Sequence, residues 1–157
     1  MIYFEDISIG DKETLPVRHI SKEEIIAFAT EYDPQPHHID EEAAKHMLLG
    51  ELVASGWHTA CSLIRMIFDA NREARAFLGS PGVEELRWRR PVKPGDTLRA
   101  TSEVIEARRS KSKPGLGLTK TRFEVFNQDD VHVMTMETWA MFACRPPSSS
   151  DRAEASS

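Results

Sequence analysis

The sequence predicts an α+β fold in which an antiparallel sheet packs against one long helix. Between Ser55 and Glu73, apolar residues recur at intervals of three and four, which is the spacing of an amphipathic helix. After Gly82 the pattern changes to segments of alternating apolar and polar residues separated by turns, typical of antiparallel strands. A long helix followed by a run of strands is the element order of an α+β domain.

Two shorter helices are expected before the long one. Ser21 and Glu24 form the S-x-x-E pattern of a capping box, which predicts a helix over residues 22–32. Asp40, followed by two glutamates and two alanines, predicts the cap of a further helical turn or two. The long helix is expected to be buried at the centre of the molecule through one apolar stripe, made of Trp57, Ala60, Cys61, Ile64, Ile67 and Phe68.

Four strands are expected in the second half of the chain, in meander order, so that each lies beside the next. They cover residues 83–90, 97–107, 118–127 and 131–143, and residues 111–115 form a loop. Residues 146–157 are rich in serine and charge and lack an apolar anchor. We therefore expect a single domain over residues 1–145, followed by a disordered tail.

Length, charge and cysteine content limit the class of protein. A chain of 157 residues can form one domain with a proper core. The net charge of −5, with scattered Lys and Arg, predicts no nucleic-acid partner and no membrane surface. No apolar run approaches the ~18 residues that span a bilayer, and the N-terminus lacks signal-peptide features, so a cytoplasmic protein is expected. Cys61 and Cys144 lack metal-ligand spacing, and we expect neither a metal nor a cofactor.

Asp33 and His38 are the main candidates for chemistry. Pro34 and Pro36 restrict the backbone between them, which predicts a stiff, non-helical loop that holds the two side chains in a defined relation. A carboxylate and an imidazole held in this way can share one water molecule and move a proton. The alternative is that Asp33 only ends a helix and His38 packs beside the next one. Because the helix dipole disfavours an anion at a C-terminus, the catalytic interpretation is favoured.

Gly56 is the second candidate, because a glycine at the start of an apolar helix leaves its backbone N–H free to face an anion such as an enolate oxygen. Close packing is the alternative reason for a glycine here. His58 is expected to be a partly buried histidine with a satisfied partner. The arginines and lysine of residues 85–96 form either a solvated sheet face or the rim of a pocket that meets phosphates, and none is assigned.

These segments resemble the MaoC-like dehydratases, the group with the hot-dog fold that contains the (R)-specific enoyl-CoA hydratases. The hydratase motif D-x-N-P-x-H-x-D is similar to residues 33–40, DPQPHHID, where Gln35 replaces the Asn. The small-residue and glycine element is similar to residues 54–57, with Ser55 where many hydratases have a histidine. Residues 86–98 resemble the strand and turn of the same family, and the resemblance covers the chain from Phe4 to about Ala143.

The resemblance implies an antiparallel sheet wrapped around a long central helix, and a homodimer or higher homo-oligomer. It also implies that Asp33 and His38 activate a water molecule, and that the Gly56 amide binds the thioester carbonyl. The expected function is reversible addition of water to a 2-enoyl-CoA or another acyl thioester, in fatty acid metabolism. Two alternatives stay open: a hot-dog acyl-CoA thioesterase, for which the central helix offers only Asp69 and Glu73 as carboxylates, and a non-catalytic acyl-thioester-binding module.

Overall fold

The structure is a computed structural model that describes residues 1–71 and 73–147. The first half contains the 3-10 helix η1 (Phe4–Asp6), strands β1 (Lys12–Thr14) and β2 (Arg18–His19), and helices α1 (Lys22–Tyr32), α2 (Pro36–Ile39), α3 (Glu41–Ala44) and α4 (Gly56–Ala70). Strands β3 (Phe77–Trp88), β4 (Thr97–Arg109), β5 (Leu116–Phe126) and β6 (His132–Ala143) follow. Most of the expected tail, residues 148–157, lies outside the described residues.

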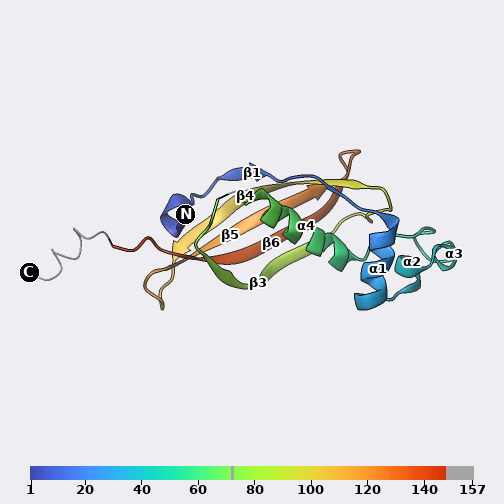
Figure 1. The fold of residues 1–157 in the computed structure, drawn as a ribbon, viewed down its shortest axis with the longest axis horizontal. Coiled ribbons are helices and arrows are strands. Elements are labelled where there is room, and N and C mark those ends of the chain that lie inside the picture. The colour runs from blue at the N-terminus through green and yellow to red at the C-terminus, as the bar shows by residue number, and fades with distance from the viewer. Residues whose placement is uncertain (72, 148–157) are drawn as a thin grey trace, which may run out of the picture.

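The six strands form one antiparallel sheet with the order β1-β4-β5-β6-β3, and β2 pairs with β4 at its side. Helix α4 lies across one face of this sheet, while α1, α2 and α3 gather at one end of the elongated molecule (Figure 1). The predicted α+β class is confirmed, and the architecture is that of a hot-dog fold.

The core lies between α4 and the sheet. Leu63 and Met66 of α4 are almost fully buried, as are Val125 and Met134, which are paired on neighbouring strands. Arg122 lies on the opposite face of β5, because side chains alternate along a strand. This alternation gives the sheet one apolar face for the helix and one charged face for solvent.

The capping box predicted at the start of α1 is confirmed. Ser21 Oγ accepts a hydrogen bond from the Glu24 amide at 3.1 Å, and the Glu24 carboxylate accepts one from the Ser21 amide at 3.2 Å. Asp40 caps α3 as expected, accepting from the amides of Glu42 and Ala43. Local pattern alone is sufficient at both helix starts, since each cap involves residues two or three positions apart.

Two predictions about the backbone are wrong, and two short strands were missed. Strand β3 begins at Phe77 and pairs with β6, so the four long strands do not follow one another in simple meander order. Strands β1 and β2 were not predicted, because runs of two or three exposed residues carry no alternation. The segment after Pro34 is not extended throughout: Pro36 occupies the first turn of α2, where its missing N–H costs nothing, and His38 lies in this turn.

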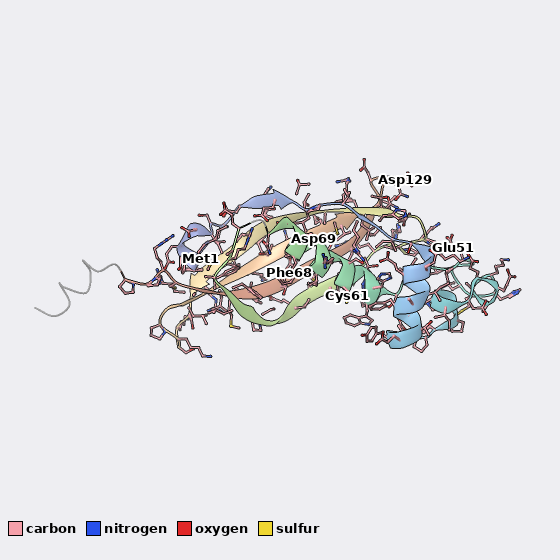
Figure 2. All side chains as sticks on the ribbon, viewed as in Figure 1. Met1, Glu51, Cys61, Phe68, Asp69 and Asp129 are labelled. Carbon is pink, nitrogen blue, oxygen red and sulfur yellow. The ribbon has the colours of Figure 1, made fainter. Side chains whose placement is uncertain are left out.

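Helix α4 has two apolar faces, where one was expected. Ala60 and Ile67 of the predicted stripe pack on the core. The other members are exposed, including Trp57 at 58% and Phe68 at 60%, so the prediction that Trp57 belongs to the core is wrong. Figure 2 shows Cys61 and Phe68 along this helix. Within the described residues, α4 therefore presents an apolar face that nothing covers.

Candidate active site

Asp33 and His38 lie side by side where α1 ends and α2 begins. Asp33 is the C-terminal cap of α1, and His38 is 6% exposed within α2. Asp33 Oδ2 and His38 Nε2 are 3.5 Å apart, so the sequence-predicted pair is brought together. A tight connection between α1 and α2 holds the two side chains close together. In this connection the Gln35 amide donates to the Asp33 carbonyl.

The backbone around Val53 determines which nitrogen of His38 carries a proton. His38 Nδ1 lies 2.7 Å from the carbonyl oxygen of Val53, which can only accept, so Nδ1 carries the hydrogen. In the neutral ring, Nε2 then has a lone pair, and it faces the carboxylate of Asp33. Two acceptors 3.5 Å apart are both satisfied by one molecule that donates a hydrogen to each, as water does.

Two side chains keep the Asp33 carboxylate ionised and oriented. Gln35 Nε2 donates to Oδ1 at 2.8 Å, and Ser55 Oγ donates to Oδ2 at 2.7 Å. These hydrogen bonds, that of Gln35 first, lower the pKa of Asp33 below its usual value, and the nearby His38 adds to the effect. A carboxylate with a lowered pKa is a poor proton acceptor, so Asp33 stays ionised beside His38.

Gly56 is the first residue of α4, and its backbone N–H donates to no acceptor among the described residues. The Trp88 indole covers this glycine, donating from Nε1 to the Gly56 carbonyl at 2.8 Å. A Cβ on residue 56 would lie 2.4 Å from Trp88 Cε2, so only glycine fits under the ring. Both reasons considered for a glycine at residue 56 therefore apply: its amide has no acceptor among the described residues, and Trp88 packs too closely for a side chain.

A pocket of about 260 Å³ lies beside His38 and Gly56, while Asp33 is not among its lining residues. Its walls are mostly apolar and come from the segment before α4 and from the end of β3, with Leu49, Val53, Ala54, Trp88, Pro91 and Val92. His37, His38 and Gly56 also line it, so the two histidines and the first residue of α4 border the same space. Burial, with His38 nearby, lowers the pKa of His37, which keeps that second ring neutral.

A larger hollow of about 350 Å³ lies over β1, β4 and β5. Most of its charged side chains form ion pairs, since Lys12 pairs with Glu103 and Arg122 pairs with Glu137. It contains neither histidine nor cysteine, and it does not reach Asp33.

In the described part of the chain, no three His, Cys, Asp or Glu side chains are placed to hold a metal ion. The described helices are also too short or too polar to cross a membrane.

An ion-paired cluster joins α1 to α4 beside the site. Glu24 accepts from Arg18 at 2.9 Å and lies 3.1 Å from His58 Nε2, while the His58 ring stacks on Phe28. His58 is 5% exposed, which agrees with the expected buried histidine, although its Nδ1 has no partner in the described part of the chain. Asp33 follows the end of α1 and Gly56 begins α4. Because this cluster holds the two helices together, it also sets the position of Asp33 relative to Gly56.

His58 should make the stability of the protein depend on pH. Burial lowers the pKa of His58 below its ordinary 6.5, with the Glu24 carboxylate opposing the shift. Below pH 6.5 the unfolded chain therefore binds a proton that the folded chain does not, and the free energy of unfolding falls. His58→Gln keeps a donor for Glu24 but cannot titrate, so we expect a smaller loss of stability between pH 7.5 and 5.5, measured by urea unfolding. The exposed His46→Gln serves as control, and an unchanged loss in His58→Gln would contradict the assignment.

Ser55→Ala should raise the pKa of Asp33 and destabilise the protein. The fully buried Ser55 hydroxyl donates to Asp33 and also accepts from the Trp57 amide at the start of α4, so its removal costs about 1–2 kcal/mol as a lost helix cap. Titration of the Asp33 carboxyl by NMR and urea unfolding measure the two effects. Ser62→Ala is the matched control, since Ser62 is a buried serine of the same helix whose hydroxyl has no partner in the described residues. Equal effects from both variants would refute a specific role for Ser55.

The sequence did not reveal that Ser55, Gln35 and Trp88 form part of the site. Gln35 and Ser55 were noted only as departures from a motif, and the structure makes both of them donors to Asp33. Trp88 lies 32 residues from Gly56 along the chain, and no spacing rule connects a strand residue with the first residue of a distant helix.

The comparisons with known proteins identify the family and the fold. A family model described as a MaoC like domain matches residues 7–127. The crystal structure of a MaoC-like dehydratase from Rhodospirillum rubrum is 34% identical with a TM-score of 0.85, covering 94% of this chain and 100% of that one. The unliganded R-hydratase PhaJ1 from Pseudomonas aeruginosa is 26% identical with a TM-score of 0.64, covering 94% and 96%. A 3-hydroxybutyryl-CoA dehydratase from Methylorubrum extorquens is 32% identical over 111 residues, which are 68% of this chain and 66% of that protein.

Fold and site together define a hot-dog protein with an acid and a histidine beside an apolar pocket. The chain belongs to the MaoC-like dehydratase family, and the predicted resemblance is confirmed.

Proposed function

We propose that this protein adds water reversibly to the double bond of a 2-enoyl thioester. One observation carries the proposal: Asp33 Oδ2 and His38 Nε2 are two acceptors 3.5 Å apart, and the His38 ring lines an apolar pocket with the free Gly56 amide. A hydratase needs a place for one water molecule, a base for its proton, and a donor for the oxygen on which negative charge develops.

The water molecule donates one hydrogen to Asp33 and the other to His38 Nε2. As its oxygen attacks C3 of the enoyl group, His38 takes the proton. The imidazolium that forms is stabilised by the Asp33 carboxylate, whose lowered pKa keeps it ionised. His38 is suited to this step because its Nδ1–H is held by the Val53 carbonyl, which fixes both the tautomer and the ring orientation.

Attack at C3 moves negative charge onto the thioester oxygen, which becomes an enolate oxygen. The Gly56 N–H donates to this oxygen, at the positive end of α4. The proton held by His38 then passes to C2, so that the hydroxyl is added at C3 and the hydrogen at C2. Dehydration is the same path in reverse, and the M. extorquens relative is named for that direction.

Hydration of crotonyl-CoA, followed as loss of enoyl absorbance, tests the proposal. A panel of enoyl-CoA thioesters of increasing length would also measure how much acyl chain the pocket accepts. Release of free thiol without loss of enoyl absorbance would instead indicate a thioesterase. The structure offers little for that reaction, because Asp69 of α4 pairs with Arg65 and does not line the pocket. Absence of turnover on every enoyl thioester would contradict the proposed function and favour a binding module.

We also propose that two copies of the chain associate through α4 and β3. The uncovered face of α4 carries Trp57, Ile64 and Phe68, and β3 is a sheet edge with exposed Phe77 and Val83. An exposed apolar face beside an unpaired strand edge favours association with a second copy. Sedimentation equilibrium measures the mass directly, and a monomer at micromolar concentration would contradict this proposal.

A further inference from the structure

Two adjacent arginines, Arg89 and Arg90, follow the end of β3 and line the pocket that contains His38. Strand β3 runs toward the end of the molecule that carries α1, α2 and α3 (Figure 1). Both arginines are exposed, so their guanidinium groups are accessible to a molecule that enters the pocket from solvent. The mechanism proposed above uses neither of them.

These two arginines differ from most of the others in having no acidic partner among the described residues. Eight of the eleven arginines that the structure describes form ion pairs with a carboxylate. Of the remaining three, Arg108 stacks over the Trp139 ring at 5.2 Å. Arg89 and Arg90 alone carry positive charge to the pocket without an acid within 4 Å among the described residues, in a chain whose net charge is −5.

Hydrogen bonds already hold the backbone of Arg89 and Arg90 and part of each arginine side chain in place. The amides of Arg89 and Arg90 both donate to the Val133 carbonyl, at 2.8 and 3.3 Å. Arg89 Nε donates to Thr135 Oγ1 at 3.0 Å, and Arg90 Nη1 donates to the Arg89 carbonyl at 2.9 Å. A guanidinium has five N–H donors, so each side chain keeps several donors for a ligand. Little ordering is needed when an anion binds, which favours affinity.

We propose that Arg89 and Arg90 form an anion-binding site at the wall of the pocket, which holds a phosphate or carboxylate group of the thioester substrate. Two neighbouring positive charges repel each other, and an anion between them removes that cost. Arginine binds phosphate and carboxylate oxygens with paired hydrogen bonds. This inference rests on the proposed function and extends it to substrate selection, because a neutral acyl chain gives two guanidinium groups nothing to bind.

The anion has two possible sources. A phosphate would belong to the carrier, which is either coenzyme A or the phosphopantetheine arm of a carrier protein. A carboxylate would belong to the acyl group. Three saturated thioesters separate these sources without any turnover: butyryl-CoA carries phosphates, succinyl-pantetheine carries only a carboxylate, and butyryl-pantetheine carries neither.

Calorimetric titration of the wild-type protein and of Arg89→Gln/Arg90→Gln with these three ligands tests the site. We expect the Kd of the anionic thioester that the arginines recognise to rise at least tenfold in the variant, while the Kd of butyryl-pantetheine stays unchanged. A rise for butyryl-CoA assigns the phosphate, and a rise for succinyl-pantetheine assigns the carboxylate. Higher salt should weaken the wild-type complex more than the variant complex.

Arg87→Gln is the matched control, because Arg87 precedes the pair on β3 but is bound to Glu85 and does not line the pocket. It should bind all three ligands as the wild type does. Unchanged affinities in the double variant, or an equal loss for the neutral ligand, would overturn the inference. Failure of the wild type to hydrate any enoyl thioester would count against the proposed function alone, since the titrations use ligands that cannot be hydrated.

Discussion

Asp33→Asn and His38→Ala are each expected to lower kcat for enoyl hydration by about 10²–10⁴-fold, the usual contribution of a positioned acid or base. Asparagine can still accept from Ser55, but it lacks the charge that orients the water molecule and stabilises the imidazolium. Alanine at residue 38 removes the imidazole nitrogen that lies 3.5 Å from Asp33 Oδ2. The initial rate with crotonyl-CoA, measured as loss of enoyl absorbance, gives both effects.

Structural damage must be separated from lost chemistry in these variants. Asp129→Asn and His46→Ala change the same residue types at exposed positions, and Asp129 lies in the turn between β5 and β6 (Figure 2). Both controls should keep the wild-type rate. All four variants should have far-ultraviolet circular dichroism spectra like that of the wild type. Hydration at the wild-type rate by either Asp33→Asn or His38→Ala would eliminate the proposed mechanism.

Gly56→Ala is expected to lower kcat by about 10²–10³-fold, as the loss of one oxyanion donor does. The added Cβ would lie 2.4 Å from Trp88 Cε2, so either the indole or the first turn of α4 must move. Movement of this turn displaces the backbone amide of residue 56 from its position at the pocket. Overpacking of this kind also costs about 1–3 kcal/mol of stability. Because the donor acts on the transition state, kcat and kcat/KM should fall together.

The double variant Gly56→Ala/Trp88→Ala tests whether the indole is the cause. Removing the ring leaves space for the new Cβ, although it also removes the hydrogen bond to the Gly56 carbonyl. The free energy of unfolding, measured in urea, should therefore fall by less than the sum of the two single variants. Strict additivity, together with a wild-type rate in Gly56→Ala, would show that the close contact has no consequence.

Much of the first half of the fold could be predicted from sequence, because it depends on residues close together along the chain. Each helix cap is satisfied within a single turn: Ser21 and Glu24 cap α1, and Asp40 accepts from the amides of Glu42 and Ala43 at the start of α3. The placement of Asp33 at a helix end was predicted for the same reason. The turn that contains His38 was predicted to be non-helical, since two prolines suggested extended backbone, but Pro36 is at a helix start, where proline is tolerated.

Periodicity predicted that α4 is apolar, but it could not say which apolar residues face the core. Ala60 and Ile67 pack on the core, while Trp57, Ile64 and Phe68 are exposed. When a helix is apolar on two sides, its periodicity is the same whether the second face packs against its own chain or against another chain. The pairing of β3 with β6 was likewise missed, because the connection between distant strands leaves no local signal.

By itself, the sequence determined the α+β class, the long amphipathic helix and the spacing of Asp33, His38 and Gly56. Each of these follows from chain stereochemistry, capping or side-chain periodicity within a few residues. The tertiary structure alone decided that Ser55 and Gln35 both donate to Asp33, that Val53 selects the His38 tautomer, and that Trp88 requires a glycine at residue 56. Arg89 and Arg90, which have no acidic partner in the described part of the chain, belong to the same group. Whether a charge is paired depends on which strands and helices the fold brings within a few ångströms, and most of those partners are far away along the chain.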